Sequence, residues 1–310
     1  MVDEEKLKSF NEENGTNIKL DDKHITLLEH KEINEVSFIK LLSIKFTNLE
    51  SLSINDLSIN NLNFLSSTHF PSLEKLSLDN NNIKSLAGIQ ILKLNNLSEL
   101  SIQRNKLESI DDLSKVELPN LKRLSFSYNY IKSIDILAKT NFTNLEFIYL
   151  DNNEIDSIYG LCLAPFSKLK HFNLNCNQIK NIDSLEKATF YGIQGVYLVE
   201  NQIENIDVFA KVNFPKLKYL NLNGNKISSI EVFTKVKFLD INSLDLEYNQ
   251  ISNIEALKNL PFNAINHLGL RNNKFDKNDE NILSIKTSLE QKYEGIDVVF
   301  GQPDKGPFGC

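Results

Sequence analysis

The feature that most constrains the fold of this chain is an internal repeat of 24 residues. Counted from its first leucine or isoleucine, the repeat begins at Leu49, Leu73, Leu97, Leu121, Leu145, Leu169, Ile193, Leu217, Ile241 and Ile265. Position 9 of the repeat is asparagine in nine successive copies, which are Asn81, Asn105, Asn129, Asn153, Asn177, Asn201, Asn225, Asn249 and Asn273. A fixed period of this length is the signature of a repeat architecture, in which each copy packs against its neighbours.

The apolar pattern within a repeat predicts one strand and one short helix. Apolar positions 4 and 6 alternate with polar positions 3, 5 and 7, as expected for a half-buried strand, and like repeats stacked in one direction predict a parallel sheet. Positions 11, 14, 17 and 22 are apolar and fill the interior; position 22 is usually phenylalanine, as at Phe190. A Ser or Asn at position 13 and an acidic residue at position 15 predict a helix N-cap and a first-turn carboxylate, followed by one or two helical turns.

The repeat LxxLxLxxNxIxxIxxLxxxxFxx resembles the leucine-rich repeat family over residues 25–300. Its subclass is similar to the SDS22-like and internalin-like group, with copies two residues longer than the usual unit of about 22. The resemblance implies an α/β fold, a right-handed leucine-rich-repeat solenoid. Its parallel β-sheet would form the concave face, with short α or 3-10 helices on the convex face. The resemblance also implies that the position 9 asparagines form a structural ladder, whose side chains bond the turn backbone.

The ends of the chain depart from the repeat, as a solenoid with covered edges requires. We expect an N-terminal cap over residues 1–48, repeats over 49–275, a C-terminal cap over 276–300 and a flexible tail over 301–310. All four segments would share one continuous core, and hence form one domain.

Each cap has its own pattern. In the N-terminal cap, a helix Asp3–Asn11 precedes a degenerate repeat without the concave motif; its convex apolar positions are Phe38, Leu41, Ile44 and Phe46. In the C-terminal cap, one apolar helix face is predicted by Ile282, Ile285, Leu289 and Tyr293. A last strand with alternating apolar residues is predicted by Ile296, Val298 and Phe300.

Composition and motifs exclude several classes of function. The 34 Lys+Arg against 41 Asp+Glu give a net charge of −7, which argues against nucleic-acid binding. The sequence contains no run of 18 apolar residues, so we expect no membrane insertion. Its acidic start is unlike a signal peptide. The sequence has no nucleotide-binding, metal-binding or catalytic motif, so we expect no cofactor, no metal and no enzyme activity. Three cysteines are too few for a disulfide framework; Cys162 and Cys176 are expected to be unpaired thiols, in a reducing, cytoplasmic location.

The concave positions 3 and 5 change character along the chain. Position 5 is serine in the first four repeats, at Ser53, Ser77, Ser101 and Ser125, and then becomes Tyr149, Asn173, Tyr197 and Asn221. Position 3 of the same later repeats holds Phe147, His171, Gly195 and Tyr219. Exposed aromatic rings favour partner contacts, so we predict a partner-binding surface, which consists of Phe147, Tyr149, His171, Tyr197, Tyr219 and, at its border, Tyr128. The alternative interpretation is that these rings only stabilise neighbouring strands.

The sequence thus predicts a non-enzymatic protein-interaction module or scaffold, a monomer that binds a protein partner on its concave face. The resemblance implies partners such as phosphatase catalytic subunits or cytoskeletal motor proteins. The alternative functions are a bacterial effector or adhesin of the internalin type, or a regulatory subunit of a phosphatase-like enzyme.

Overall fold

The computed structural model describes residues 2–14, 19, 22–27, 41, 43–44, 46–63, 70–91 and 94–300. The chain forms two compact units, Met1–Leu145 and Glu146–Cys310. The predicted tail over 301–310 and the convex residue Phe38 lie outside the described residues.

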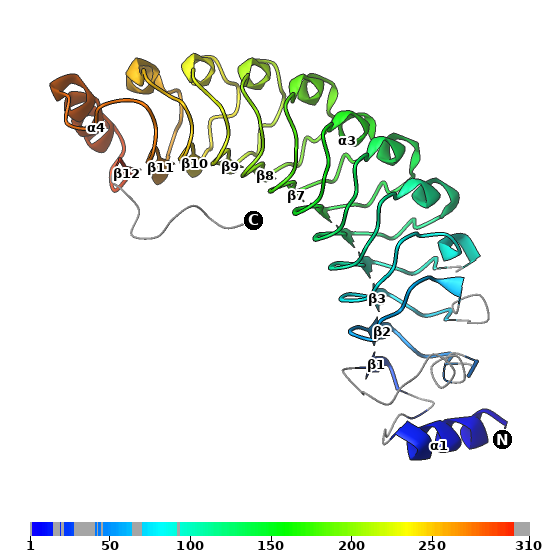
Figure 1. The fold of residues 1–310 in the computed structure, drawn as a ribbon. Coiled ribbons are helices and arrows are strands. Elements are labelled where there is room, and N and C mark those ends of the chain that lie inside the picture. Colours follow the sequence, from blue (N-terminus) through cyan, green and yellow to red (C-terminus); the bar gives the residue numbers. More distant parts are fainter. Residues whose placement is uncertain are drawn as a thin grey trace. The chain divides into compact units, whose positions relative to one another are not determined.

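The described part of the N-terminal unit contains five parallel strands that pair in chain order. Its described elements are α1 (Val2–Asn14), β1 (His24–Leu27), β2 (Ser51–Ile54), β3 (Lys75–Ser77), the 3-10 helix η2 (Ile89–Ile91), β4 (Glu99–Ser101), η3 (Asp111–Lys115), β5 (Arg123–Ser125) and η4 (Asp135–Lys139). The strands lie along one side of the unit, and the 3-10 helices lie along the other (Figure 1).

The C-terminal unit continues the same alternation of strand and short helix (Figure 1). Its elements are β6 (Phe147–Tyr149), α3 (Tyr159–Leu163), β7 (His171–Asn173), η5 (Asp183–Lys187), β8 (Gly195–Tyr197), η6 (Asp207–Ala210), β9 (Tyr219–Asn221), η7 (Glu231–Thr234), β10 (Ser243–Asp245), η8 (Glu255–Asn259), β11 (His267–Gly269), α4 (Glu280–Lys292) and β12 (Asp297–Val299). From β7 to β11, strands pair with partners 24 residues away, as where Val196 lies beside Leu220. The predicted parallel α/β architecture is therefore confirmed.

The core of each repeat consists of the apolar positions that the pattern predicted. In the C-terminal unit the position 22 rings are fully buried, and those of Phe190 and Phe214 stack at 6.2 Å between centroids. The Phe190 ring also meets Phe172 of its own repeat edge-on at 6.1 Å. These rings fill the space between neighbouring repeats, so each repeat depends on the next one for its packing.

The position 9 asparagines bond the turns of neighbouring repeats to one another. Asn201 shows the pattern: its Oδ1 accepts the backbone N–H of Ile179 in the preceding repeat at 3.0 Å. Its Nδ2 donates to the carbonyl of Leu174 in that same repeat at 2.9 Å. Nδ2 also lies within hydrogen-bond distance of the Leu198 and Val199 carbonyls of its own turn, both at 3.2 Å. One side chain thus satisfies backbone groups that the turn leaves unpaired, and it ties two repeats together.

The ladder supports a turn whose backbone is unfavourable for most residues. Position 8, directly before the asparagine, takes a left-handed conformation in repeat after repeat; Glu200 has φ 50° and Tyr248 has φ 53°. Such a conformation costs about 1–3 kcal/mol for a residue other than glycine. Hydrogen bonds on both sides of the residue offset this cost, so position 8 does not need to be glycine.

A second set of cross-repeat bonds was not predicted. At position 7, Asn175 Oδ1 accepts the backbone N–H of Val199 at 2.8 Å, and Asn223 Oδ1 accepts that of Glu247 at 2.7 Å. Val199 has no side-chain oxygen to offer the following repeat. There the N–H of Asn223 bonds instead to Asn221 Oδ1 of its own strand at 3.1 Å. The backbone N–H of position 7 is therefore bonded either by position 7 of the preceding repeat or by position 5 of its own strand.

The helix side differs from the prediction by one residue. In the 3-10 helices from η3 to η8 the N-cap is the buried isoleucine at position 14, such as Ile182, and not the residue at position 13. The position 13 side chain still bonds the first helical N–H, as where Asn181 Oδ1 accepts from Asp183 at 2.7 Å. The reason is that an Asn or Ser oxygen reaches the N–H two residues ahead, in a side-chain turn that precedes the helix.

The structure extends the predicted caps. The first helix, α1, runs from Val2 to Asn14 and is longer than predicted. Strand β1 pairs in parallel with β2, although the sequence there has lost the concave motif. At the other end, Asp279 caps α4 by accepting the backbone N–H groups of Asn281 and Ile282. The predicted C-terminal helix and last strand are confirmed as α4 and β12, while the segment boundaries stay a prediction.

We expect replacement of Asn201 by alanine to destabilise the chain by about 1–3 kcal/mol, because it leaves buried turn groups without partners. The matched control is Asn273→Ala. Asn273 makes the same set of bonds but is only half-buried, so water can replace them and the loss is smaller. Urea unfolding of both variants measures the difference, and equal losses would contradict the dependence on burial.

Replacement of Phe190 by alanine should cost about 3–5 kcal/mol, because the ring is fully buried between repeats and its loss opens a cavity. The neighbouring Tyr191 is 52% exposed, so Tyr191→Ala should change the unfolding free energy little. Urea unfolding followed by circular dichroism compares the two. Similar losses for both variants would show that the ring does not carry the packing between repeats.

Candidate binding surface

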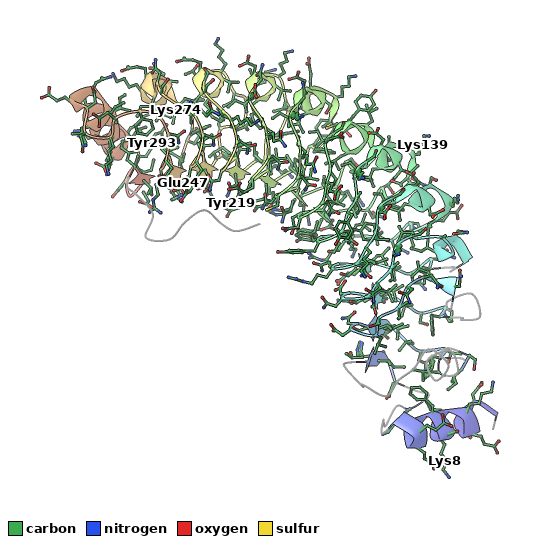
Figure 2. The ribbon with its side chains drawn as sticks, in the orientation of Figure 1. Lys8, Lys139, Tyr219, Glu247, Lys274 and Tyr293 are labelled. Carbon is green, nitrogen blue, oxygen red and sulfur yellow. The ribbon has the colours of Figure 1, made fainter. Side chains whose placement is uncertain are left out.

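The side chains at positions 3 and 5 of β6–β9 lie on the face of the sheet that points away from the core. The residue between them is buried in every strand, as for Ile148 in β6 and Val196 in β8. The flanking Phe147, Tyr149 and Tyr197 are half-buried. Tyr219 in β9 is 40% exposed and lies along the strand side of the unit (Figure 2). The strand period therefore places aromatic rings on an open surface.

Three of these rings form a stack across neighbouring strands. Phe147 and His171 are paired in the sheet, and their rings are parallel within 5° at 5.5 Å between centroids. His171 and Tyr197 follow at 6.2 Å with an interplanar angle of 17°. Offset stacking of this kind is favourable. It restricts the orientations of these three rings before any partner binds.

Gly195 makes the stack possible. It occupies position 3 of β8, where the other strands of this surface have a side chain. A Cβ atom at Gly195 would lie 2.4 Å from His171 Nδ1 and 2.7 Å from Tyr197 Cε2, closer than atoms can approach. The rings of His171 and Tyr197 therefore lie in the space that a side chain would fill. The role of Gly195 could not be predicted from the sequence, because it depends on the orientation of the two rings.

The phenol groups of this surface lie within electrostatic range of one another. Burial raises the pKa of the Tyr197 hydroxyl above its ordinary value, and the phenols of Tyr219 and Tyr149 raise it further. A phenolate is thus disfavoured here, so Tyr197 keeps its proton and remains able to donate a hydrogen bond.

A depression of about 310 Å³ lies among these rings. It is lined by residues of three adjacent strands and the turn after β7, which are Phe147, Tyr149, His171, Asn173, Asn175 and Tyr197. At its border the Lys170 ammonium lies 6.0 Å from the centre of the Phe147 ring and forms an ion pair with Glu146 at 2.5 Å. The depression therefore has aromatic walls and amide groups in its lining.

Tyr128, the sixth predicted contact residue, belongs to the N-terminal unit. It is 43% exposed, and the Arg104 guanidinium lies 4.2 Å from the centre of its ring. Position 5 serines of that unit form hydrogen bonds within the chain. Ser77 donates to Asn55 Oδ1 at 2.9 Å, and Ser101 donates to Asp79 Oδ1 at 2.7 Å. This strip is polar and hydrogen-bonded, in contrast to the aromatic surface of β6–β9.

The cysteines require one correction. Cys162 is a free and buried thiol, as predicted, and burial raises its pKa to about 11. Cys176 was predicted to be unpaired, but it is disulfide-bonded. The prediction failed because pairing depends on distance in space, which cysteine spacing does not reveal. Since disulfides persist in oxidising compartments, the cysteine count no longer supports a reducing one.

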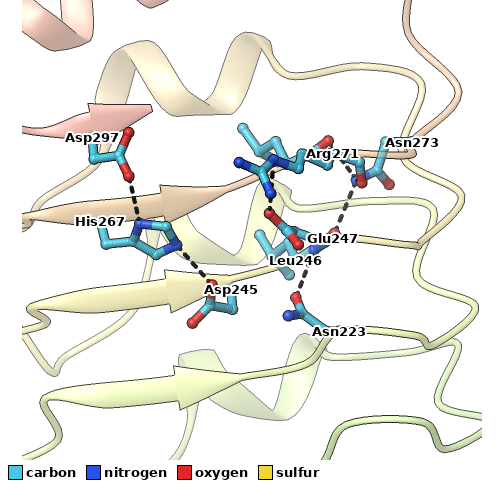
Figure 3. A network of polar contacts seen from close by, with 9 residues as sticks. Asn223, Asp245, Leu246, Glu247, His267, Arg271, Asn273 and Asp297 are labelled. Atoms are coloured by element: carbon cyan, nitrogen blue, oxygen red, sulfur yellow. Dashed lines mark hydrogen bonds and ion pairs between the residues drawn. The ribbon is translucent and has the colours of Figure 1, made fainter. Parts of the chain in front are cut away.

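A polar network on the same face of β10–β12 was missed by the sequence analysis (Figure 3). The His267 ring lies between two carboxylates, with Nε2 2.9 Å from Asp245 Oδ1 and Nδ1 3.2 Å from Asp297 Oδ2. Both bonds raise the pKa of His267, and the one to Asp245 contributes most. Only an imidazolium can donate from both ring nitrogens, so these contacts favour the charged ring.

Next to this histidine, Glu247 is a buried carboxylate. It is 7% exposed, and its Oε1 lies 3.6 Å from Arg271 Nε. Burial raises the pKa of the Glu247 carboxyl, while the positive charge of Arg271 opposes that change. The partners of His267 and Glu247 come from different repeats, which explains why no local motif predicted the network.

The described residues offer no metal centre and no membrane span. No three His, Cys, Asp or Glu side chains in this part of the chain are grouped so that they could hold a metal ion. None of the helices found there is both long enough and apolar enough to cross a bilayer.

Family models match much of the repeat region. The model described as leucine rich repeats (2 copies) matches residues 119–163 and 192–235, and a second leucine rich repeat model matches residues 71–131. Together with the period and the parallel sheet, these matches show that the chain is a leucine-rich repeat protein. Comparison with curated proteins gives no match.

Solved structures share this fold. An internalin from Listeria monocytogenes is 20% identical with a TM-score of 0.71, over 97% of this chain and 95% of that one. The ectodomain of the Arabidopsis thaliana receptor kinase GASSHO1/SCHENGEN3 is 22% identical with a TM-score of 0.57, over 86% of this chain and 34% of that one. TLR13, in its complex with ssRNA13, is 20% identical with a TM-score of 0.61, over 83% of this chain and 39% of that one. At these identities the likeness concerns the fold alone.

The His267 network should make stability depend on pH. The pKa of His267 is raised in the folded chain, so its contribution is complete below the unfolded value of about 6.5 and is lost as pH rises through the folded value. We therefore expect the urea midpoint to fall above about pH 6.5. His267→Gln cannot titrate and should lack this part of the fall. Parallel pH profiles for wild type and variant would contradict the assignment.

Proposed function

We propose that this leucine-rich repeat chain is a non-enzymatic protein-binding module, and that it binds its partner on the aromatic surface of β6–β9. The observation that carries the proposal is the ring stack of Phe147, His171 and Tyr197, which lines an open depression. Binding energy concentrates in aromatic anchors of this kind. Because stacking already orders the rings, little side-chain entropy is lost on binding.

The competing interpretation is that the rings only stabilise the sheet. Stacking accounts for Phe147 and His171, since each ring lies against its neighbour. It does not account for Tyr219, which is 40% exposed and has no ring partner among the described residues. A partner that covered this exposed tyrosine would bury apolar surface, which favours binding. The exposure of Tyr219 therefore supports a contact role.

Two structures of the same fold were solved with a bound ligand. The receptor kinase ectodomain is in complex with CASPARIAN STRIP INTEGRITY FACTOR 2, and TLR13 is in complex with ssRNA13. For this chain, the net charge of −7 disfavours a nucleic-acid ligand, because a polyanion would be repelled. We therefore propose a protein partner, bound by the chain as a monomer and without a cofactor.

Replacement of Tyr149, Tyr197 and Tyr219 by serine should abolish partner capture while the fold persists. These side chains point away from the core. Serine already occupies position 5 in the first four repeats, for example at Ser101, and position 3 in another, at Ser243. Each lost anchor weakens binding by about 2 kcal/mol, so three losses move a micromolar complex beyond detection. Affinity capture from the native lysate measures the yield, and circular dichroism checks the fold.

The matched control changes the other side of the chain. Lys139, Lys187 and Lys211 follow or end short helices on the helix side, and their replacement by serine should leave capture unchanged. The ion pair of Lys211 with Glu186 is exposed and contributes little to stability. If the folded tyrosine variant captures its partners at wild-type yield, the partner-binding surface lies elsewhere.

A further inference from the structure

Position 5 of the candidate surface alternates between two kinds of side chain. The order is Tyr149, Asn173, Tyr197 and Asn221, and the sheet register places each of these residues beside the next one. A tyrosine ring therefore recurs on every second strand. Neighbouring strands lie about 4.8 Å apart, so the backbone positions of these tyrosines repeat about every 9.6 Å across the strands.

The two asparagines of this row are held in one orientation by the backbone. Asn173 Oδ1 accepts the N–H of Asn175 at 3.0 Å, and Asn221 Oδ1 accepts the N–H of Asn223 at 3.1 Å. Since each oxygen accepts a bond from its own turn, each amide directs its NH₂ group away from that turn. The chain thus fixes which end of each amide is available.

The NH₂ groups retain donor capacity. An amide nitrogen has two hydrogens, and Asn173 Nδ2 uses one of them toward Asp151 Oδ1 at 3.1 Å. Within the described part of the chain, Asn221 Nδ2 has no hydrogen-bond partner. The row therefore presents aromatic rings and N–H donors in alternation.

The spacing discriminates among extended and helical ligands. A polyproline II helix rises about 3.1 Å per residue with three residues per turn, so its repeat is about 9.3 Å, close to the spacing of the two tyrosine positions. A β-strand repeats each face after about 6.7 Å, and an α-helix rises only about 5.4 Å per turn. Neither of these spacings matches two strand separations.

The chemistry agrees with the spacing. Polyproline II has no internal hydrogen bonds, so its carbonyls are free to accept from the asparagine NH₂ groups. Proline-rich segments dock on aromatic-lined grooves. A ligand carboxylate would be repelled by Asp151 and by the net charge of −7 on the chain.

We propose that this row binds a proline-rich segment of the partner in the polyproline II conformation, with prolines on Tyr149 and Tyr197 and backbone carbonyls on Asn173 and Asn221. The segment runs across β6–β9, perpendicular to the strands. This inference rests on the proposed function and names the chemistry of the partner.

The test uses a fluorescently labelled oligoproline peptide of about eight residues, which spans about 25 Å, and a Gly/Ser peptide of the same length. Fluorescence anisotropy with the full chain should show saturable oligoproline binding, at least about tenfold tighter than that of the Gly/Ser peptide. Equal affinities for the two peptides, or no binding of either, would overturn the inference.

Asn221→Asp tests the donor directly. The carboxylate can still accept the N–H of Asn223, but it has no hydrogen to donate and repels a carbonyl oxygen. Oligoproline affinity should fall about tenfold, and circular dichroism checks that the variant is folded. The matched control is Asn205→Asp on the helix side, where the asparagine oxygen makes the same kind of bond, to the N–H of Asp207 at 2.7 Å. Wild-type affinity in Asn221→Asp would contradict the proposed donor role.

The two proposals can fail separately. If the tyrosine triple variant loses its native partner but oligoproline does not bind the wild type, the binding surface stands and the proline-rich ligand is wrong. If the triple variant keeps its partner, the proposed function itself is wrong, whatever the peptides show.

Discussion

The structure depends on the hydrogen bonds that the position 9 asparagines make inside the turns. A chain that turns out of a strand every 24 residues leaves backbone groups without strand partners at each turn. In repeat after repeat one amide side chain supplies both the acceptor and the donors, as Asn201 does for Ile179 and Leu174. Because these bonds join one repeat to the next, they fix the register of the strands as well as the shape of the turn.

That register determines what the exposed face of the sheet can do. Strands that pair without a slip place position 5 of each repeat beside position 5 of the next, so a change of residue there changes a row on the surface. The buried Phe190 and Phe214 hold the spacing from the core side. The face of β6–β9 can therefore alternate tyrosine and asparagine without any change in the fold that supports it.

The sequence predicted most of the fold, because what repeats is visible as a period. The strands, the position 22 phenylalanines and the position 9 asparagines all recur at 24 residues. Strand β1 was missed because its pairing with β2 does not follow the motif. The fit of His171 and Tyr197 over Gly195, the bonds of His267 and the disulfide of Cys176 were missed for another reason. They join particular residues that do not recur with the 24-residue period, so the repeat pattern could not predict them. The aromatic surface could be predicted as a set of positions, but its stacking could not.

Native-state hydrogen exchange of single backbone amides tests the role of the ladder most directly. The N–H of Ile179 is bonded to buried Asn201, whereas the N–H of Asp183 is bonded to the exposed side chain of Asn181. If the ladder holds the repeats together, the Ile179 amide exchanges only when neighbouring repeats open, and it is far slower than the Asp183 amide. The same should hold for Ile203 and Ile227, whose N–H groups are bonded to Asn225 and Asn249. Exchange of these isoleucine amides as fast as that of Asp183 would contradict the account.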